Sequence, residues 1–269
     1  MTIRFFISVL ILGWWYTSAG AADNESAQNC IVEHYTAKII AKYPHLKSSF
    51  TQGLVYDSGF IYESTGLYGQ STLQVYSLDM PVKLRKESLP RRYFAEGLAL
   101  VGDRLFQLTY QSGTAFVYDR KTLEPVKRFM YQGEGWGLAF DDESLIMSDG
   151  SDTLKFLDPE TFIITRRLKV SRCGEPLYRL NELEYVSGKI YANIWQTNSI
   201  AIIDPENGKV TGEIDLAAVA SRYRDDASVD VLNGIAWDVA NKRLFVTGKL
   251  WPDMYHIELQ KDEAHQRNR

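Results

Sequence analysis

The sequence predicts an all-β fold, a five-bladed β-propeller whose last blade is closed by an N-terminal strand. A short hairpin pattern recurs five times, the copies are regularly spaced, and each copy is followed by a third apolar strand. Propeller blades are four-stranded units that recur every ~40 to 50 residues. A sandwich or an up-and-down barrel would not require five copies of one unit.

The N-terminus has the layout of a cleavable secretory signal. Arg4 is followed by an apolar run, Phe5 to about Tyr16, and by small residues that end in Ala19-Gly20-Ala21. A spanning helix would need roughly 20 apolar residues. We therefore expect residues 1–21 to be a signal peptide and residues 22–269 to form a single five-bladed catalytic domain. The mature protein is expected to be periplasmic or secreted, with no membrane attachment.

The first hairpin lies in the string FTQGLVYDSGFIYESTGLYG. It is predicted to have strands Gly53–Tyr56 and Phe60–Glu63, joined by the turn Asp57–Gly59. In an antiparallel hairpin the start of the first strand and the end of the second strand lie at the same end. Gln52 and Glu63 are therefore expected to lie side by side at one rim.

Four further strings repeat the hairpin: AEGLALVGDRLFQLTY, GWGLAFDDESLIMSDG, NELEYVSGKIYANIWQT and NGIAWDVANKRLFVTGKLW. The corresponding positions lie 44, 40, 45 and 52 residues apart, and they are Gly53, Gly97, Gly137, Glu182 and Gly234. Third strands follow in TLQVYSL, TAFVYD, TLKFLD, SIAIID and MYHIEL. Fourth strands follow the first four of these, in PVKLRKES, PVKRFMY, ITRRLKV and KVTGEIDL.

The fifth copy has no fourth strand, because the chain becomes polar after Leu259. The segment Tyr35–His45 alternates as an outer strand would, so we expect it to complete the last blade and cover its edge. An insertion, Ala217–Asp230, lengthens the last repeat. We expect this insertion to be partly helical and to overhang the central funnel.

Composition excludes several classes of function. The formal net charge is −4 with Lys and Arg scattered along the chain, which leaves no basic surface for nucleic acid or for a membrane. The four histidines lack metal-ligand spacing, so neither a zinc centre nor a Cys/His nucleophile is expected. Whether Cys30 and Cys173 are bridged cannot be read from the sequence, and neither can the oligomeric state. The partner is expected to be a small molecule or a peptide.

The hairpin geometry predicts which residues share the rim of the funnel. They start the first strand or end the second strand of each blade, and they are Gln52, Glu63, Glu96, Tyr110, Trp136, Asp149, Asn181, Glu182, Trp195, Asn233 and Lys249. Polar groups between aromatic walls are what a small-ligand pocket requires. Two alternatives stay open: Trp136 and Trp195 can belong to the core between blades, and Glu63 can be a solvated rim carboxylate.

Nine strings of the chain, in order, resemble one enzyme family: FTQGL, ESTGLYG, EGL, GWGL, SDG, LNELEY, ANIWQT, LNGIAWD and RLFVTGKLWP. They are similar to the plant and bacterial type of glutaminyl-peptide cyclotransferase, the glutamine cyclotransferases with a five-bladed propeller. The resemblance spans roughly Thr36 to Leu259, and LNELEY and VTGKLWP are its most specific strings. It implies an acyltransferase that converts N-terminal glutamine, in peptides or as free glutamine, to pyroglutamate with release of ammonia. The animal enzymes with this activity are a different, zinc-dependent type.

The resemblance implies that Glu63, within ESTGLYG, is the catalytic glutamate. A single carboxylate can take a proton from the attacking amine and return it to the departing ammonia. The resemblance also gives pocket positions to Gln52, Asn181, Trp195 and Lys249. Lys249 and Asn181 are candidates for stabilising the tetrahedral oxyanion, and Gln52 for holding the polar groups of the substrate.

Aromatic residues are expected to form the walls. Trp136 and Trp195 would pack on the glutamine methylenes and exclude water, which suppresses hydrolysis. Plant members of the family have tryptophan where this chain has Tyr110, so the wall there is smaller and carries a hydroxyl. This substitution leaves the substrate preference open.

No cofactor is expected to be required for catalysis. Glu96, Asp149 and Glu182 would attract a cationic α-ammonium, or hold a structural calcium ion along the channel, as the plant relatives imply, although no loop has EF-hand spacing. The competing hypothesis is a non-catalytic periplasmic propeller that binds a peptide terminus or a small ligand. A propeller lactonase or sugar dehydrogenase would need a metal shell or a cofactor site, and the sequence offers no candidate for either.

Overall fold

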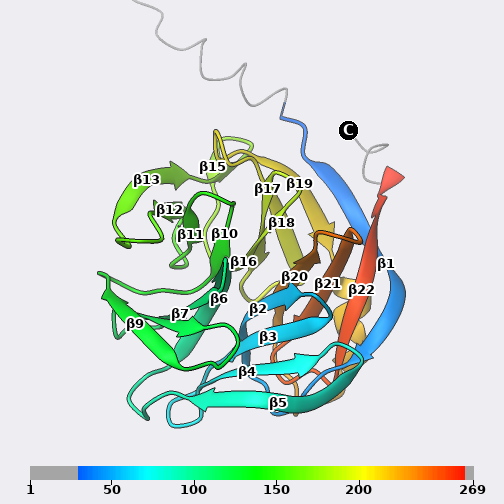
Figure 1. Ribbon diagram of the computed structural model, residues 1–269. Coiled ribbons are helices and arrows are strands. Elements are labelled where there is room, and N and C mark those ends of the chain that lie inside the picture. The colour runs from blue at the N-terminus through cyan, green and yellow to red at the C-terminus, as the bar shows by residue number, and fades with distance from the viewer. Residues whose placement is uncertain (1–29, 264–269) are drawn as a thin grey trace, which may run out of the picture. The chain divides into compact units, whose positions relative to one another are not determined.

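The computed structural model describes residues 30–263, and its strands form the predicted five-bladed propeller (Figure 1). Blade 1 contains β2 (Thr51–Asp57), β3 (Phe60–Thr65), β4 (Thr72–Ser77) and β5 (Met80–Ser88). Blade 2 contains β6 (Ala95–Val101), β7 (Arg104–Thr109), β8 (Thr114–Asp119) and β9 (Pro125–Met130). Blade 3 contains β10 (Leu138–Phe140), β11 (Leu145–Met147), β12 (Thr153–Leu157) and β13 (Ile164–Lys169). The predicted signal peptide lies outside the described residues.

The last two blades complete the ring. Blade 4 contains β16 (Leu180–Val186), β17 (Lys189–Ile194), β18 (Ser199–Ile203) and β19 (Val210–Asp215). Blade 5 contains β20 (Leu232–Asp238), β21 (Arg243–Gly248), β22 (Asp253–Lys261) and β1 (Glu33–Pro44). A small hairpin of β14 (Ser171–Arg172) and β15 (Glu175–Pro176) joins blades 3 and 4. The predicted helical insertion contains α1 (Ala217–Ala220) and a 3-10 turn, η1 (Ser221–Tyr223).

The N-terminal strand closes the last blade, as predicted. β1 pairs antiparallel with β22 over its length, from Tyr35 opposite Lys261 to Pro44 opposite Asp253. Figure 1 shows the two strands, blue and red, side by side. The beginning of β1 also pairs in parallel with β19, which links blades 4 and 5 into one eight-stranded sheet. This second pairing was not predicted, and it shields the outer edge of blade 4 as well.

Glycine recurs at the same point of the hairpin because neighbouring inner strands lie very close there. A Cβ atom on Gly53 would lie 2.4 Å from the backbone nitrogen of Leu98 in the next blade. A Cβ atom on Gly137 would lie 2.0 Å from the backbone oxygen of Asn181. Only a residue without a side chain permits these approaches. The glycines at these positions therefore allow neighbouring inner strands to approach closely, and the fourth copy has Glu182 at the equivalent place.

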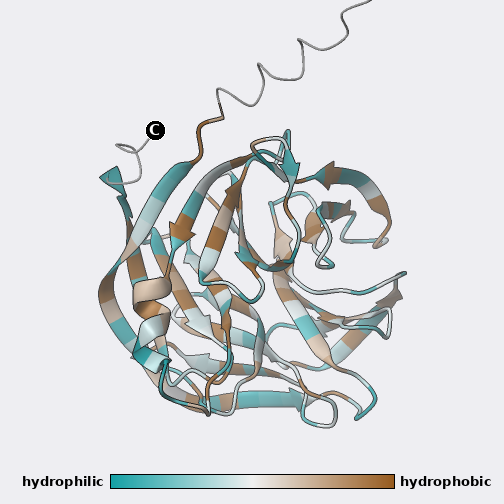
Figure 2. Cartoon of the chain, turned by 180° about the vertical axis from the view of Figure 1, so that it is seen from behind, coloured by the Kyte–Doolittle hydropathy of each residue, from teal (hydrophilic) through white to brown (hydrophobic). Residues whose placement is uncertain are grey.

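Apolar side chains fill the spaces between blades. Hydrophobic and hydrophilic residues both occur along the strands (Figure 2). In the outer strand β1 half-buried and exposed positions alternate, as expected for a strand whose two faces have different environments. The core between blades 1 and 5 is made of Leu54, Ile61, Tyr76, Leu78, Ala236, Phe245 and Met254.

Both Cys30 and Cys173 are disulfide-bonded. No helix among residues 30–263 has the length and apolar character needed to cross a membrane.

Candidate active site

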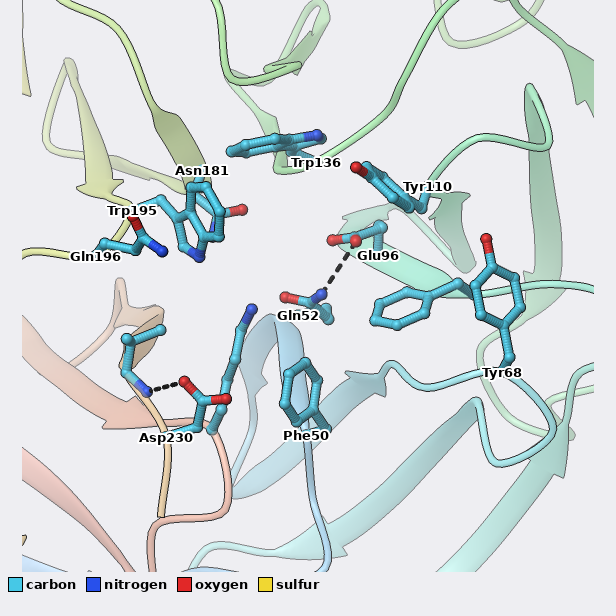
Figure 3. A pocket seen from close by; sticks show the side chains of 13 residues that line it. Phe50, Gln52, Tyr68, Glu96, Tyr110, Trp136, Asn181, Trp195, Gln196 and Asp230 are labelled. Atoms are coloured by element: carbon cyan, nitrogen blue, oxygen red, sulfur yellow. Dashed lines mark hydrogen bonds between the residues drawn. The ribbon is translucent and has the colours of Figure 1, made fainter. Parts of the chain in front are cut away.

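A cavity of about 390 Å³ lies at the end of the propeller where the first strands begin and the second strands end. Every predicted site residue except Glu63 lines it, that is, Gln52, Tyr110, Trp136, Asn181, Trp195 and Lys249. The other lining residues are Phe50, Tyr68, Phe94, Glu96, Gln196, Asp230 and Val231. Figure 3 shows Glu96 and Gln52 next to each other, between Phe50 on one side and Trp136 and Tyr110 on the other.

β-Bulges place the central polar residues. In blade 1 Thr51 pairs with Thr65 and Gly53 with Ser64, so Gln52 is an extra residue in β2. A bulge bends the strand and redirects the side chain at that point. Equivalent register shifts interrupt β6, β16 and β20. The residues at this position are Gln52, Glu96, Asn181 and Asn233, with Trp136 at the same place just before β10.

The remaining predicted site residues lie at the ends of the second strands. Tyr110, Trp195 and Lys249 each follow directly after the last residue of β7, β17 and β21. In blade 1 the equivalent residue is Gly66, which carries no side chain. A Cβ atom there would lie 2.4 Å from the ring of Phe94. The glycine therefore leaves room for Phe94 to form this part of the wall.

The prediction that Glu63 lies at the rim is wrong. Glu63 precedes Gly66 by three residues, and successive side chains of a strand point to opposite faces. Its side chain consequently turns away from the cavity and into the space between blades 1 and 5, where it is completely buried. Its carboxylate contacts His45 Nε2 (3.0 Å) and accepts hydrogen bonds from Ser49 Oγ (3.0 Å), Thr51 Oγ1 (2.7 Å), Gln74 Nε2 (2.8 Å) and the Tyr76 hydroxyl (3.2 Å).

These contacts hold Glu63 as a carboxylate. Burial alone would raise its pKa, but His45 and the hydrogen bonds from Thr51 and Gln74 bring the pKa below its ordinary value of 4.5. Burial likewise opposes a charge on His45, yet Glu63 and the backbone oxygen of Trp251 raise the pKa of that imidazole. The lowered pKa of Glu63 and the raised pKa of His45 both favour a buried ion pair, which we call the His45–Glu63 clasp. It joins the segment before β2 to blades 1 and 5.

Glu96 is the buried carboxylate in the lining of the cavity, which also includes the exposed Asp230. It is 5% exposed, and among the described residues its carboxylate accepts one hydrogen bond, from Gln52 Nε2 at 3.0 Å. The Gln52 amide is oriented by Asn233, whose Nδ2 donates to Gln52 Oε1 at 3.2 Å. Burial raises the pKa of Glu96 well above its ordinary value, and the opposing charge of Lys249 does not compensate. Glu96 is therefore a stronger base than an ordinary carboxylate when it is ionised.

Lys249 brings a cation to the same cavity. Its side chain is buried, and its Nζ lies 4.7 Å from the centre of the Phe50 ring, a cation–π contact. Burial lowers the pKa of Lys249, while the carboxylates of Glu96 and Asp230 act in the opposite direction. A buried ammonium group of this kind can stabilise negative charge that develops on a bound substrate.

The two tryptophans belong to the cavity wall and are half-buried. Trp136 and Trp195 pack edge to face, with ring centres 5.4 Å apart and an interplanar angle of 81°. Trp136 Nε1 donates to Glu134 at 2.9 Å. Gly150 supports the other side of this ring, because a Cβ atom there would lie 2.7 Å from it. The Trp136 ring is thus held in one orientation before any ligand binds.

The other two acids predicted for the mouth lie elsewhere. Asp149 forms an ion pair with Lys155 at 2.8 Å. Glu182 is buried deeper, where its carboxylate accepts hydrogen bonds from the backbone N–H groups of Leu54 (3.3 Å) and Ile235 (2.8 Å). In residues 30–263 no three His, Cys, Asp or Glu side chains gather at one point. The described side chains do not form a carboxylate cage for calcium, and a structural calcium ion stays a prediction.

Glu96 was not predicted to be the reactive acid, although its position in the repeat indicates that it lies in the cavity. Glu96 immediately precedes the repeated glycine, as Gln52, Trp136 and Asn233 do in their own copies. Glu63 instead aligns with Gln107 in the second copy, a position inside the blade. Phe50, Tyr68, Phe94, Gln196 and Asp230 were also missed, because they lie in the connections before or after the paired strands.

Comparisons with known proteins agree with this architecture. Residues 10–259 match the family model for glutamine cyclotransferase. The chain is 39% identical over 267 residues to a glutaminyl-peptide cyclotransferase of Arabidopsis thaliana, covering 98% of this chain and 82% of the relative. The fold is similar to the crystal structure of glutaminyl cyclase from Myxococcus xanthus, with a TM-score of 0.81 and 39% identity. That match covers 86% of this chain and 99% of the other.

Proposed function

Because this chain belongs to the glutamine cyclotransferase family, we propose that it is an acyltransferase that converts N-terminal glutamine to pyroglutamate and releases ammonia. The substrate is a peptide or free glutamine. The observation that carries the mechanistic part of the proposal is Glu96, a buried carboxylate of raised pKa in a cavity that also holds an amide, an ammonium and two indoles.

In the reaction the α-amine attacks the carbonyl carbon of its own side-chain amide. A C–N bond forms, a five-membered ring closes, and the bond to the amide nitrogen breaks. Both reactants belong to one molecule, so the protein chiefly has to hold the side chain in the folded-back geometry. One proton leaves the attacking amine and one joins the departing nitrogen.

We assign this proton transfer to Glu96 in place of Glu63. A carboxylate of raised pKa is basic enough to accept the proton of the amine and acidic enough to return it to the leaving group. Gln52 supports the assignment, because its amide is oriented by Asn233 and donates to Glu96. The carboxylate is therefore held toward the cavity.

Lys249 and Asn181 are the candidate donors for the oxygen that becomes negative in the tetrahedral intermediate. Both are buried and line the cavity. Trp136 and Trp195 offer an apolar surface for the methylenes of glutamine and displace water from them. Exclusion of water favours ring closure over hydrolysis to glutamate.

The test is turnover of a dipeptide such as Gln-Ala, followed by ammonia release together with loss of the free amine. We expect both to occur in equal amounts, whereas Asn-Ala releases no ammonia. Ammonia accompanied by Glu-Ala would indicate simple hydrolysis and contradict the proposal. Binding without ammonia release would support a non-catalytic propeller instead. A chelator is expected to leave the rate unchanged, since the proposal needs no cofactor.

We also propose that the protein acts in the periplasm or outside the cell. The charged, apolar and small-residue pattern of residues 1–21 supports export. Expression of the full chain should yield a mature protein that starts near Ala22 in the exported fraction. Retention of the intact N-terminus in the cytoplasm would contradict this part of the proposal.

A further inference from the structure

A second cavity, of about 450 Å³, adjoins the candidate active site. We propose that it binds the second and third residues of a peptide substrate, so that the protein favours peptides over free glutamine. This inference rests on the proposed function. The cavity is lined by Asn198, Ala217, Ala220, Ser221, Tyr223, Arg224, Val229, Asp230, Val231, Leu232 and Trp251.

The two cavities share a wall. Asp230 and Val231 line both of them, so the second cavity begins where the first one ends. Both also lie at the same end of the blades: β18 starts at Ser199, β20 starts at Leu232, and α1 follows the end of β19. A peptide whose N-terminal glutamine occupies the first cavity can therefore continue across this wall into the second.

The shared wall is rigid and tied to Lys249. The backbone N–H of Asp230 donates to the Lys249 oxygen and the Lys249 N–H donates to the Val231 oxygen, each at 2.9 Å. Trp251 Nε1 donates to the backbone oxygen of Asp230 at 2.8 Å. The carboxylate of Asp230 is turned back onto the N–H of Val231 at 2.6 Å. The second cavity is thus bounded on one side by a fixed element of the first.

The opposite side is formed by the helical insertion. The hydroxyl of Tyr223 in η1 contacts the hydroxyl of Tyr255 (2.6 Å) and donates to Asp253 (2.8 Å), which anchors the insertion to blade 5. Ala217 and Ala220 face the cavity with their small side chains. Because these walls are anchored, the cavity exists without a ligand, and preformed sites bind at a lower entropic cost.

The lining carries one cation, Arg224, and one anion, Asp230, and is otherwise neutral, so its chemistry suits a short peptide of low net charge. Leu232, Trp251 and Tyr223 form a buried floor for an apolar side chain. Asn198 and Ser221 stand at the exposed rim and offer hydrogen-bonding groups to a peptide backbone. An apolar floor with a few polar groups at its edge matches the third residue of a sequence such as Gln-Ala-Leu better than it matches a free amino acid.

The experiment compares kcat/KM for free glutamine and for Gln-Ala-Leu in the wild type and in two variants on α1. Ala220→Trp fills the second cavity, and Ala218→Trp puts the same indole on the exposed side of the same helix, outside both cavities. We expect the wild type to prefer the tripeptide by about tenfold, in line with one well-packed apolar side chain. Ala220→Trp should lower that preference at least fivefold, and Ala218→Trp should preserve it. Ala217→Leu, a milder filling of the cavity, should give an intermediate preference if the tryptophan variant fails to fold.

Equal kcat/KM values for the two wild-type substrates would overturn the inference. An equal loss for both substrates in Ala220→Trp would overturn it as well, since it would indicate disturbance of Lys249. Calorimetric binding of the ring-closed products, pyroglutamate and pyroglutamyl-Ala-Leu, separates this inference from the proposed function because it needs no turnover. Tighter binding of the peptide product, reduced in Ala220→Trp, supports the second cavity even if no ammonia is released, and equal binding of the two products opposes it.

Discussion

Two buried glutamates in adjacent blades have opposite electrostatic surroundings. Glu63 is completely buried and Glu96 is 5% exposed, so burial penalises a charge on either of them. The pKa of Glu63 nevertheless falls below its ordinary value and that of Glu96 rises well above it. The difference lies in the partners. Glu63 contacts an imidazole and is saturated with donors, whereas Glu96 receives one amide donor.

The comparison indicates that a buried carboxylate is reactive when its partners do not fully offset the cost of burying its charge. A carboxylate whose charge is fully satisfied stays ionised and serves as a structural anchor. A carboxylate that is buried with one donor has a raised pKa, so its ionised form is a stronger base, as a group that accepts a proton requires. The same residue type therefore serves the clasp in one blade and the candidate catalytic site in the next.

The largest expected effect is the loss of activity in Glu96→Gln. The amide keeps the shape and an acceptor for Gln52 but cannot take up the proton of the amine. We expect kcat for Gln-Ala to fall by about 10² to 10⁴, with the thermal midpoint of unfolding nearly unchanged. Ammonia release and circular dichroism measure the two quantities. A Glu96→Gln variant with wild-type kcat would exclude Glu96 as the proton carrier.

The matched variant Glu63→Gln should show the reverse pattern. It removes the charge that pairs with the buried His45, and breaking a buried ion pair from one side destabilises by about 3 kcal/mol. We expect urea unfolding to report this loss, while kcat of the folded protein stays within a few-fold of the wild type. A stably folded Glu63→Gln protein without activity would reverse the assignment of the two glutamates.

The fold could be predicted because the same hairpin pattern recurs five times, with glycine at the aligned position in four of the five copies. Glycine allows inner strands to approach closely at Gly53 and Gly137, and each copy carries the turn residues of its hairpin. The parallel pairing of Glu33–Thr36 with β19 could not be predicted. It belongs to no repeat, and it depends on where the first residues of β1 lie once the last blade has closed.

Part of the site could also be predicted from the repeat, because the repeat defines where each second strand ends. Tyr110, Trp195 and Lys249 come one residue after the second strand, a place that the repeat defines well. Glu63 was placed with them because its strand was predicted to end at residue 63, whereas β3 continues to Thr65. The bulge that presents Gln52 changes the register by one residue. A sequence pattern does not reveal such a shift. Along a strand, a shift of one residue decides whether a side chain points to the cavity or to the core.

A third prediction concerns the charge beside Glu96. Lys249 is the cation that lowers the pKa of Glu96, so its removal in Lys249→Met should raise that pKa further. Because the ionised carboxylate accepts the proton, the acidic limb of the profile of kcat/KM against pH should move to higher pH by about one pH unit. Lys155→Met, which removes the partner of Asp149 outside the cavity, is the control and should leave the limb in place. An unshifted limb in Lys249→Met would show that the two groups are not coupled.

The smallest expected effect is the pH dependence of the clasp. The pKa of Glu63 is lowered in the folded state, so its contribution to stability is present above the ordinary value of 4.5 and is lost as the pH falls through the folded pKa. The pKa of His45 is raised, so its contribution is present below the ordinary value of 6.5 and is lost as the pH rises through the folded pKa. The clasp should therefore stabilise most between about pH 4.5 and pH 6.5.

Urea unfolding of the wild type and His45→Gln at pH 5.5 and pH 9 checks this dependence. The difference in the free energy of unfolding between the two proteins should be larger at pH 5.5 than at pH 9, because folding raises the pKa of His45. His256→Gln is the matched control, because burial and Arg243 lower the pKa of His256 and its contribution changes with pH in the opposite direction. A difference for His45→Gln that is the same at both pH values would mean that folding does not raise the pKa of His45. A difference that is smaller at pH 5.5 than at pH 9 would mean that His45 is neutral in the fold, and that Glu63 keeps its charge through its hydroxyl and amide donors alone.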